Sequence, residues 1–505
     1  MRPLAIPLKV VLEMPSDTDK TADKERLISA LSMAIGTDLP VDIILDVIRR
    51  APALLRENEF SIQVIIATMS KCLKVIAAGS SQCLGIGIDI GTTNLVASLF
   101  DLKTFRKIDQ MELTNPQTAV AADVLSRIHE SMKGRGEGLH RLLIDGVNML
   151  VGRLCDANSI DCNDIFAMTV AGNTIMTHYF LGLPVENVPM APYIPAAHKI
   201  GFIHTSELGI SVNRNAIAYV FPNTGSYVGG DIVSGIMISG LYKDKEPSLL
   251  IDVGTNVEIV VGCKDWIIVG AGAAGPALEG DIAGIGMRAE DGAIYEIEIN
   301  APTPGNPPGE VDVKYRTIGD KEPTGICGSG MIELVSELFR SGIIDQKGKF
   351  NGPSKLILEL DDNPGFLIHK TRGKELLIRQ TEIENFLRSK AALFASIRVL
   401  VKSIGLNFRD LHRVYVCGSF GAHINVDKAI SIGMLPHIDK KKFVVLGNSS
   451  LAGAEMLLGD SDLTDEIEKI SSMITYREMN TDGAFLKEFP AAMFLPHTNP
   501  EVLKA

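Results

Sequence analysis

The chain has 505 residues and a mass of 54.5 kDa, which is enough for about three domains with well-buried cores. Hydrophobic residues make up 46% and charged residues 22%, close to globular averages, which argues against a disordered or collagen-like chain. The formal net charge of −12 makes nucleic acids and anionic membranes poor partners. We find neither an uninterrupted apolar run of membrane-spanning length nor an N-terminal signal pattern, and we expect a cytoplasmic protein.

Seven cysteines are scattered through the sequence, too few and too far apart for a disulfide framework. No two of them form a Cys-x-x-Cys pair, so the usual zinc spacings and the common ferredoxin ligand patterns are missing. Any metal cluster would need ligands gathered by the fold or by a second subunit. The seven are Cys72, Cys83, Cys155, Cys162, Cys263, Cys327 and Cys417.

Residues 1–84 differ from the rest of the chain and predict a small α+β domain. The turn-forming residues 78–81 (AGSS) close it. Its expected elements are a strand at 6–11, a helix at 20–34, a helix at 41–55 and a strand at 61–67.

From Leu84 onward, glycines recur at the ends of apolar runs, and strands alternate with helices, which indicates α/β architecture. Periodicity predicts helices at 119–132 and 139–154, separated by a glycine-rich turn at 134–138. A further helix is predicted at about 382–404, and the run 303–309 (TPGNPPG) is interpreted as an exposed loop.

An internal repeat is the most informative feature. The apolar strand 84–94 (LGIGIDIGTTN) ends in Asp-x-Gly-Thr-Thr, and 249–256 (LLIDVGTN) repeats the pattern. In each copy the Gly lets a ligand approach the backbone, N–H and Thr hydroxyl groups bind phosphate oxygens, and Asp89 or Asp252 can hold Mg²⁺ through water. One such motif is usually an ordinary turn, but two copies favour hairpins that grip a triphosphate from both sides. The expected contacts are Gly91, Thr92, Thr93, Asn94, Gly254, Thr255 and Asn256.

A third segment, 414–421 (VYVCGSFG), is a strand running into a turn suited to adenine and ribose, with contacts expected from Gly418, Ser419, Phe420 and Gly421. Together the three segments resemble the phosphate-1, phosphate-2 and adenosine motifs of the ASKHA superfamily of acetate and sugar kinases, Hsp70 and actin. The resemblance implies a two-lobed, actin-like (ribonuclease H-like) ATPase at 85–505 that uses ATP and Mg²⁺. Lobe I is expected at about 85–245 and lobe II at about 246–505.

Two further helix starts belong to this comparison. Asp231, in Gly-Gly-Asp before a small-residue helix, lies where hexokinase-like members carry a catalytic Asp, shortly before the second phosphate loop. Either it is the catalytic base or it is an ordinary helix cap. The run 324–331 (TGICGSGM) opens a helix whose N–H groups at Gly328, Ser329 and Gly330 could face a nucleotide, and the alternative is a plain glycine turn.

Other segments resemble the reductive activators of corrinoid proteins over about residues 84–495, and residues 1–84 resemble that family's linker end and middle domain. The resemblance implies an enzyme that uses ATP to drive the one-electron reduction of a Co(II) corrinoid to Co(I) on a partner corrinoid protein, and a homodimer. The segments that carry it are Asn115–Gln117, Ala122–Ile128, Gly172–His178, Ala273–Gly280, Gly286–Ala289, Gly325–Gly330 and Gly447–Ala454.

The sequence also departs from that family. Members carry a two-iron ferredoxin domain before the middle domain or four-iron clusters after the ATPase, and this sequence shows ligands for neither iron–sulfur cluster. Two explanations stay open, an engineered start that removed the ferredoxin part or electron supply by a separate ferredoxin. Val257 replaces a family Gly, and 270–272 (GAG) replaces a hydroxyl-rich stretch. Lys390, in a Lys-Ala helical segment, is expected either to reach the nucleotide or to be solvated.

Three functions are compatible with these observations. The leading hypothesis is an ATP-hydrolysing activator in which Asp89 and Asp252 organise Mg²⁺ and Asp231 orients the attacking water. The second is a small-molecule kinase, which would need a polar acceptor pocket beside Asp231. The third is a nucleotide-gated module that binds a corrinoid protein and hydrolyses little ATP. Phosphate release with and without corrinoid protein, and a screen of phosphate acceptors, would separate them.

Overall fold

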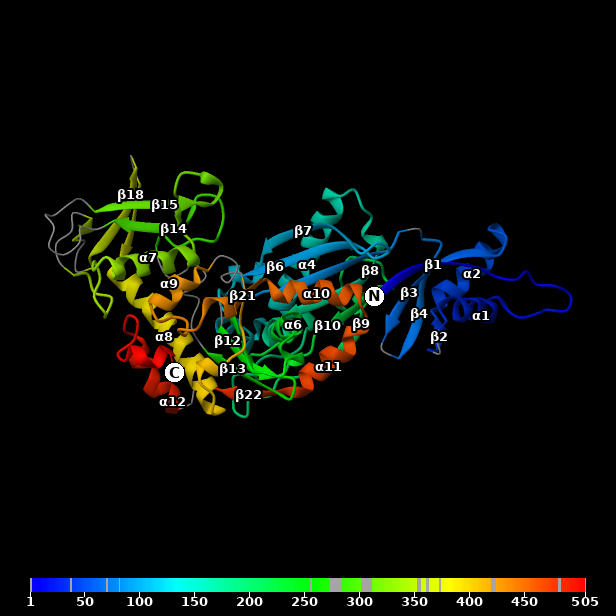
Figure 1. Ribbon diagram of the computed structural model, residues 1–505. Coiled ribbons are helices and arrows are strands. Elements are labelled where there is room, and N and C mark those ends of the chain that lie inside the picture. Colours follow the sequence, from blue (N-terminus) through cyan, green and yellow to red (C-terminus); the bar gives the residue numbers. More distant parts are fainter. Residues whose placement is uncertain are drawn as a thin grey trace. The chain divides into compact units, whose positions relative to one another are not determined.

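The structure, a computed structural model, divides into two compact units, which are described one at a time. Unit 1 comprises Met1–Ile238 and Ser449–Ser472, and unit 2 comprises Ser239–Asn448 and Met473–Ala505 (Figure 1). The residues that the structure describes are 2–36, 39–69, 71–80, 82–254, 257–272, 284–300, 311–351, 356–359, 363–371, 374–418, 424–479 and 483–504.

Unit 1 begins with a four-stranded sheet in the order β1-β3-β4-β2, coloured blue in Figure 1. β1, β3 and β4 are antiparallel neighbours, and β2 runs parallel to β4. Alternate β-branched residues of β3 join the apolar stripes of both helices in one core. The elements are β1 (Ala5–Val11), α1 (Asp23–Ile35), β2 (Val41–Ile43), α2 (Leu45–Glu57), β3 (Ser61–Met69) and β4 (Cys72–Ala78).

The main sheet of unit 1 has the order β7-β6-β5-β8-β10-β9. β5, β6 and β7 form an antiparallel meander, whereas β5, β8 and β10 are parallel. The elements are β5 (Leu84–Ile90), β6 (Asn94–Asp101), β7 (Arg106–Thr114), η1 (Pro116–Ala119), α3 (Val124–Glu130), η2 (Ser131–Arg135), α4 (Gly136–Ala157), η3 (Cys162–Asp164), β8 (Ile165–Gly172), α5 (Thr174–Leu181), β9 (Gly201–His204), η4 (Thr205–Leu208), β10 (Ile217–Val220), α6 (Gly230–Ser239), α10 (Ser449–Gly459) and α11 (Leu463–Met473).

The central strand β5 alternates between isoleucine and glycine, and its two faces therefore differ. Ile86 and Ile88 share a buried core with α4 residues on one face. On the other face, a Cβ on Gly87 would lie 3.2 Å from the backbone nitrogen of Glu455 in α10. The two strand glycines thus let the backbone of α10 approach the sheet closely.

The main sheet of unit 2 repeats this plan. Its order is β21-β20-β11-β12-β13-β22, with β11, β12 and β13 as an antiparallel meander and β11, β20 and β21 parallel. The three-strand meander followed by two parallel strands therefore occurs twice in the chain, which confirms the two-lobed, ribonuclease H-like fold class. The strands are β11 (Ser248–Val253), β12 (Val257–Cys263), β13 (Trp266–Gly272), β20 (Val414–Cys417), β21 (Phe443–Gly447) and β22 (Ile474–Glu478).

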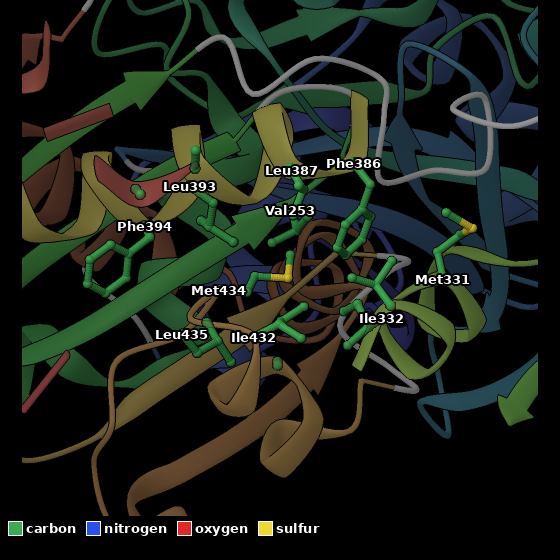
Figure 2. Close-up of a cluster of buried hydrophobic side chains, with 14 of the residues drawn as sticks. Val253, Met331, Ile332, Phe386, Leu387, Leu393, Phe394, Ile432, Met434 and Leu435 are labelled. Atoms are coloured by element: carbon green, nitrogen blue, oxygen red, sulfur yellow. The ribbon is translucent and has the colours of Figure 1, made fainter. Parts of the chain in front are cut away.

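Helices and two three-stranded sheets complete unit 2 around one core. Figure 2 shows Val253 of β11 among side chains of α7, α8 and the segment after α9, all buried in that core. This packing holds the end of β11 in place. The remaining elements are η5 (Leu241–Lys243), β14 (Ala293–Asn300), β15 (Asp312–Thr317), η7 (Ile318–Asp320), β16 (Gly325–Ile326), α7 (Gly328–Arg340), β17 (Ile357–Leu358), β18 (Gly365–Thr371), β19 (Lys374–Arg379), α8 (Gln380–Ser403), η8 (Phe408–Asp410), α9 (Val426–Ser431), η10 (Lys440–Lys442), α12 (Gly483–Ala492) and η11 (Pro500–Lys504).

Most predicted elements are confirmed, but the predicted helices at 119–132 and 41–55 begin later than expected, the first at Val124. The strands at 6–11 and 61–67 and the helices at 20–34 and 382–404 correspond to β1, β3, α1 and α8. Residues 41–43 form a strand because they pair with β4, so the predicted helix begins only at Leu45. The predicted glycine turn at 134–138 is confirmed as a break but is shorter than expected: Gly134 has a left-handed, non-helical backbone (φ 85°) at a kink between two helices, and α4 already begins at Gly136. The predicted loop 303–309 lies outside the described residues.

The units group residues differently from the two predicted lobes. Lobe II was expected to run without interruption from about 246, whereas 449–472, which contain α10 and nearly all of α11, belong to unit 1. The physical reason is the glycine-lined face of β5, which only a closely packed helix can cover. Among the described helices, none combines the length and the hydropathy that a bilayer crossing requires.

Candidate functional site

The first repeated motif is the β5–β6 hairpin of unit 1. Asp89 follows Gly85 and Gly87 at the two-residue period of the strand, so its side chain lies on the face that α10 covers. There the hydroxyl of Ser450, in the first turn of α10, donates a hydrogen bond of 2.7 Å to Asp89 Oδ1. The strand end and the helix start therefore meet at a carboxylate.

The start of α10 is held by α6. Ser234 Oγ donates to the carbonyls of Ser449 (2.6 Å) and Ser450 (3.1 Å). A Cβ on Gly453 would collide with Ser234 Oγ, so glycine is required for this contact. Three chain segments that are distant in sequence thus converge on Asp89.

Asp231 lies in the same unit, at the start of α6. Gly229 and Gly230 precede it, and a Cβ on either would collide with the Gly172–Asn173 backbone or with Phe221. The Asp231 carboxylate accepts from the adjacent Ile232 N at 2.8 Å; Asp231 is the second residue of α6, so this is not the N-cap bond, which would join the residue before the helix to its second or third N–H. Burial, together with the negative charge of Asp89, raises the pKa of Asp231 to about 7. The two predicted carboxylates of unit 1 therefore interact electrostatically.

The loop between β5 and β6 carries the predicted phosphate contacts Gly91, Thr92, Thr93 and Asn94. A Cβ on Gly91 would collide with the carbonyl of Asn94, so glycine closes this tight loop. Thr92 is buried, and its hydroxyl accepts from Asn173 Nδ2 at 3.1 Å. Asn94 Oδ1 is buried and has no hydrogen-bond partner among the described residues.

The oxygen atoms of this site are suitable ligands for a hard divalent cation. Asp89 and Asp231 supply carboxylate oxygens in unit 1, and the unpartnered Asn94 Oδ1 is a further oxygen at the same hairpin. Mg²⁺ prefers such ligands and keeps several waters, so it needs few protein oxygens. Within the described part of the chain, no group of three or more His, Cys, Asp or Glu side chains forms a preassembled metal site.

The second motif lies at the end of β11 in unit 2. Glu258 stands directly opposite Asp252 in the β11–β12 pair and is 6% exposed. Directly opposed residues share a face of the sheet, so this hairpin also carries two acidic side chains together. Gly254 follows the strand, whereas Thr255 and Asn256 lie outside the described residues.

The predicted adenosine segment follows β20, which is parallel to β11. Gly418 has φ 90°, and a Cβ there would collide with the Val253 carbonyl. The same Cβ would lie 2.8 Å from Asp252 Oδ1, so the structure brings Gly418 next to the second aspartate. Ser419, Phe420 and Gly421 lie outside the described residues.

The glycine-rich start of α7 is closely packed. Cys327 is buried at the N-cap, where its thiol donates to the Ile294 carbonyl at 3.3 Å and lies 3.2 Å from Ser329 Oγ. A Cβ on Gly330 would collide with the same carbonyl. Packing on β14 therefore accounts for Gly330, while the nucleotide contacts of Gly328, Ser329 and Gly330 stay predictions.

Lys390 is not available for the predicted nucleotide contact, and it is not solvated either. Its side chain is fully buried, and Nζ donates to the carbonyls of Ala492, Phe494 and Pro496, each at 2.7 Å. Burial lowers the pKa of Lys390 to about 7. The ammonium is saturated by three carbonyls at and just after the end of α12, so we withdraw Lys390 from the candidate site.

Three residues beside the predicted site were missed in the sequence. Ser450 binds Asp89, Asn173 binds Thr92, and Glu258 accompanies Asp252. Glu258 had a signal, a lone charge inside an apolar strand. Ser450 and Asn173 lie in segments that were used only for the family resemblance, because their contacts depend on the fold.

Comparison with known protein families divides the whole chain into three consecutive parts. Residues 1–81 match the RACo linker region, residues 84–244 match the RACo middle region, and residues 246–505 match the C-terminal domain of RACo, the ASKHA domain. The part matched by the middle region is the one that the sequence analysis assigned to lobe I.

Individual relatives are similar to the chain over most of its length. The chain is 31% identical over 421 residues to the corrinoid activation enzyme RamQ of Eubacterium limosum, covering 80% of this chain and 69% of that protein. It is 25% identical to the [Co(II) methylated amine-specific corrinoid protein] reductase of Methanosarcina barkeri, covering 77% and 73%. A solved reductive activator for a corrinoid, iron–sulfur protein superposes with a TM-score of 0.92 at 35% identity, covering 99% of this chain and 80% of that chain.

Proposed function

This chain belongs to the RACo family, and from that premise we propose that it is a reductive activator that uses ATP to drive the reduction of a Co(II) corrinoid to Co(I) on a partner corrinoid protein. The observation that carries the proposal is the match to the solved reductive activator along 99% of the chain. Reductive activators of corrinoid proteins are enzymes, and an ASKHA domain implies nucleotide binding.

Within this proposal, ATP phosphates bind at the two Asp-x-Gly-Thr hairpins. Backbone N–H groups and the hydroxyls of Thr92 and Thr93 contact phosphate in unit 1, and Gly254, Thr255 and Asn256 do so in unit 2. Asp231 orients the attacking water and accepts its proton, which its raised pKa favours. Gly418 and the three residues after it seat the adenosine.

The described side chains suit one expected cofactor, Mg²⁺, and not the other, an iron–sulfur cluster. Mg²⁺, held by Asp89 and Asp252 through water, would neutralise phosphate charge when bound. An iron–sulfur cluster does not fit the described cysteines, because Cys327 is buried against a carbonyl and the described residues contain no group of three or more His, Cys, Asp or Glu side chains that could hold a metal. We assign electron delivery to a centre outside the described residues, such as that of an external ferredoxin.

Phosphate release tests the proposal. We expect Mg²⁺-dependent ATP hydrolysis by the full chain, and a rate that falls at least tenfold in Asp89→Asn and in Asp252→Asn, because each loses a charge that organises the cation. Exposed Asp145→Asn on α4 is the matched control and should keep the wild-type rate. Wild-type rates in both hairpin variants would refute the assignment.

The same assay separates the alternatives. An activator should change its hydrolysis rate when a Co(II) corrinoid protein is added, and no acceptor should be phosphorylated. A kinase would yield a phosphorylated small molecule in an acceptor screen. A gated binding module would bind the corrinoid protein in the presence of nucleotide while releasing almost no phosphate.

A further inference from the structure

The loop after β5 rests on a buried polar frame. Asn115 and Arg127 are both fully buried beneath it. Asn115 Nδ2 donates to the Gly91 carbonyl at 2.9 Å, Arg127 Nη2 donates to the Thr92 carbonyl at 2.7 Å, and Asn115 N donates to the Thr93 carbonyl at 2.8 Å. Three successive carbonyls of the loop are therefore tied to one frame.

This frame determines how the loop presents its N–H groups. A trans peptide unit is planar, so its N–H points away from its carbonyl. Because the carbonyls of Gly91 and Thr92 point to the frame, the N–H groups of Thr92 and Thr93 point to the opposite side. Successive N–H groups aimed to one side make an anion-binding concavity.

The hydrogen bonds around the Thr92 hydroxyl also favour phosphate binding. Asn173 Oδ1 accepts from Met176 N at 3.0 Å, which identifies the other end of that side chain as the amide nitrogen. This nitrogen donates to Thr92 Oγ1. The Thr92 oxygen therefore acts as an acceptor here, and its own proton can be given to a phosphate oxygen.

Arg127 carries a positive charge, and the groups that accept its hydrogen bonds are uncharged. Its other acceptors are neutral: the Ala121 carbonyl (3.0 Å), Gln117 Oε1 (2.9 Å) and Met176 Sδ (3.2 Å). Asp123 acts on it only at longer range, because its carboxylate binds Ser126. Among the residues that the structure describes, none pairs a carboxylate with this guanidinium.

The charge persists at neutral pH. Burial lowers the pKa of Arg127 to about 10, which still leaves the guanidinium protonated. A buried cation is costly unless an anion compensates it. The direction of the Thr92 and Thr93 N–H groups shows where that anion would lie, on the far side of the loop from the guanidinium.

We propose that Arg127 is a positioning residue of the first phosphate loop, which shapes the loop through the Thr92 carbonyl and supplies the positive charge that the bound phosphates of ATP compensate. This inference rests on the proposed function, because it requires ATP at this loop. It predicts that Arg127 contributes to the affinity for a triphosphate and not to the affinity for the nucleoside part.

Two variants of the full chain test the charge. Arg127→Gln removes the charge and, because its amide nitrogen is two bonds closer to Cα, also removes the donor to the Thr92 carbonyl, whereas Arg127→Lys keeps the charge at low pH with fewer donors. We would measure dissociation constants for a non-hydrolysable ATP analogue with Mg²⁺ and for AMP. At pH 6, Arg127→Gln should bind the triphosphate about tenfold or more weakly and AMP within about twofold of wild type, and Arg127→Lys should keep the triphosphate preference.

Lys390→Met is the matched control, since Lys390 is likewise a buried cation bound to backbone carbonyls. It should lower the Tm and leave the ratio of the two dissociation constants unchanged. A folded Arg127→Gln protein with the wild-type ratio would overturn the inference. A wild-type chain that binds no triphosphate would overturn the proposed function, which is a separate outcome.

Arg127→Lys gives an independent answer if Arg127→Gln fails to fold. A lysine buried at this position loses its proton at a lower pH than arginine, as the pKa of about 7 for Lys390 illustrates. The triphosphate affinity of Arg127→Lys, relative to wild type, should therefore fall between about pH 6 and pH 9, while AMP affinity stays level. If the triphosphate affinity of Arg127→Lys did not change with pH, the charge at position 127 would not contribute to binding, and the inference would be overturned.

Discussion

Asp231 is costly to ionise in the folded chain. Burial and the charge of Asp89 raise its pKa to about 7, whereas an unfolded aspartate titrates near ~3.9. Between these two values the folded chain binds more protons than the unfolded chain, so the free energy of unfolding falls as the pH rises through this window. The residue thus lowers stability at the pH where its carboxylate is needed.

Removing that carboxylate should therefore stabilise the protein, and more so at higher pH. Asp231→Asn should raise the Tm at pH 8, by about 2–4 °C for each kcal/mol gained, and should change it less at pH 5. Thermal unfolding at the two pH values measures this difference, with exposed Asp145→Asn as the control that shifts both equally. An equal effect of Asp231→Asn on the Tm at both pH values would contradict a raised pKa for the buried Asp231.

At the scale of elements, the sequence predicted what is local. The strand–Asp-x-Gly-Thr pattern placed both hairpins and the strand before Gly418, because a tight turn and an apolar strand depend on neighbouring residues. The covering of β5 by α10 joins segments more than 300 residues apart, although the glycines at positions 85 and 87 already indicated a close backbone approach.

Lys390 shows why the rest could not be predicted. Its helix was placed correctly, but the three carbonyls that surround its ammonium come from residues 492–496, about a hundred positions later. The pattern around Lys390 resembles that of any helix in which a lysine could be exposed. Only the packing of α12 against α8 decides that this lysine is buried.

The α6–α10 contact gives a prediction at this scale. Gly453→Ala would drive a methyl group into Ser234 and should lower the stability of unit 1 by about 1–3 kcal/mol. It should also slow ATP hydrolysis, because α10 carries the Ser450 hydroxyl that binds Asp89. Thermal unfolding followed by circular dichroism, with phosphate release, measures both effects.

Gly152→Ala is the matched control for this helix substitution. Gly152 lies inside α4, and a Cβ there meets nothing within 4 Å. Alanine should stabilise the helix by up to about 1 kcal/mol and leave hydrolysis unchanged. If Gly453→Ala behaved like Gly152→Ala, the tight contact between α6 and α10 would be refuted.

For the whole molecule, the proposed activity requires an electron from outside the described residues. We expect the visible spectrum of a Co(II) corrinoid protein to change to that of Co(I) only when the chain, ATP and a reduced ferredoxin are all present. The ferredoxin loses one electron and the cobalt gains one, while ATP is hydrolysed to ADP and phosphate. Asp89→Asn should abolish the change with ferredoxin still supplied.

Two controls accompany this reaction. ADP in place of ATP should give no Co(I), because no hydrolysis then drives the uphill transfer. Cobalt reduction by the chain and ATP without ferredoxin would contradict our assignment of the electron source. The homodimer implied by the family resemblance stays a prediction, which sedimentation of the same preparation would test.

The late return of the chain to unit 1 has a consequence for biosynthesis. A ribosome completes residues up to Ile238 and then adds roughly 210 more before Ser449 emerges, which at ~5–20 residues per second takes about 10–40 s. During that interval the β5 face that presents Gly85, Gly87 and Asp89 lacks its covering helix. The nascent chain therefore carries a sheet with one uncovered face for tens of seconds, and we expect translation speed and chaperone supply to govern how much active protein a cell obtains.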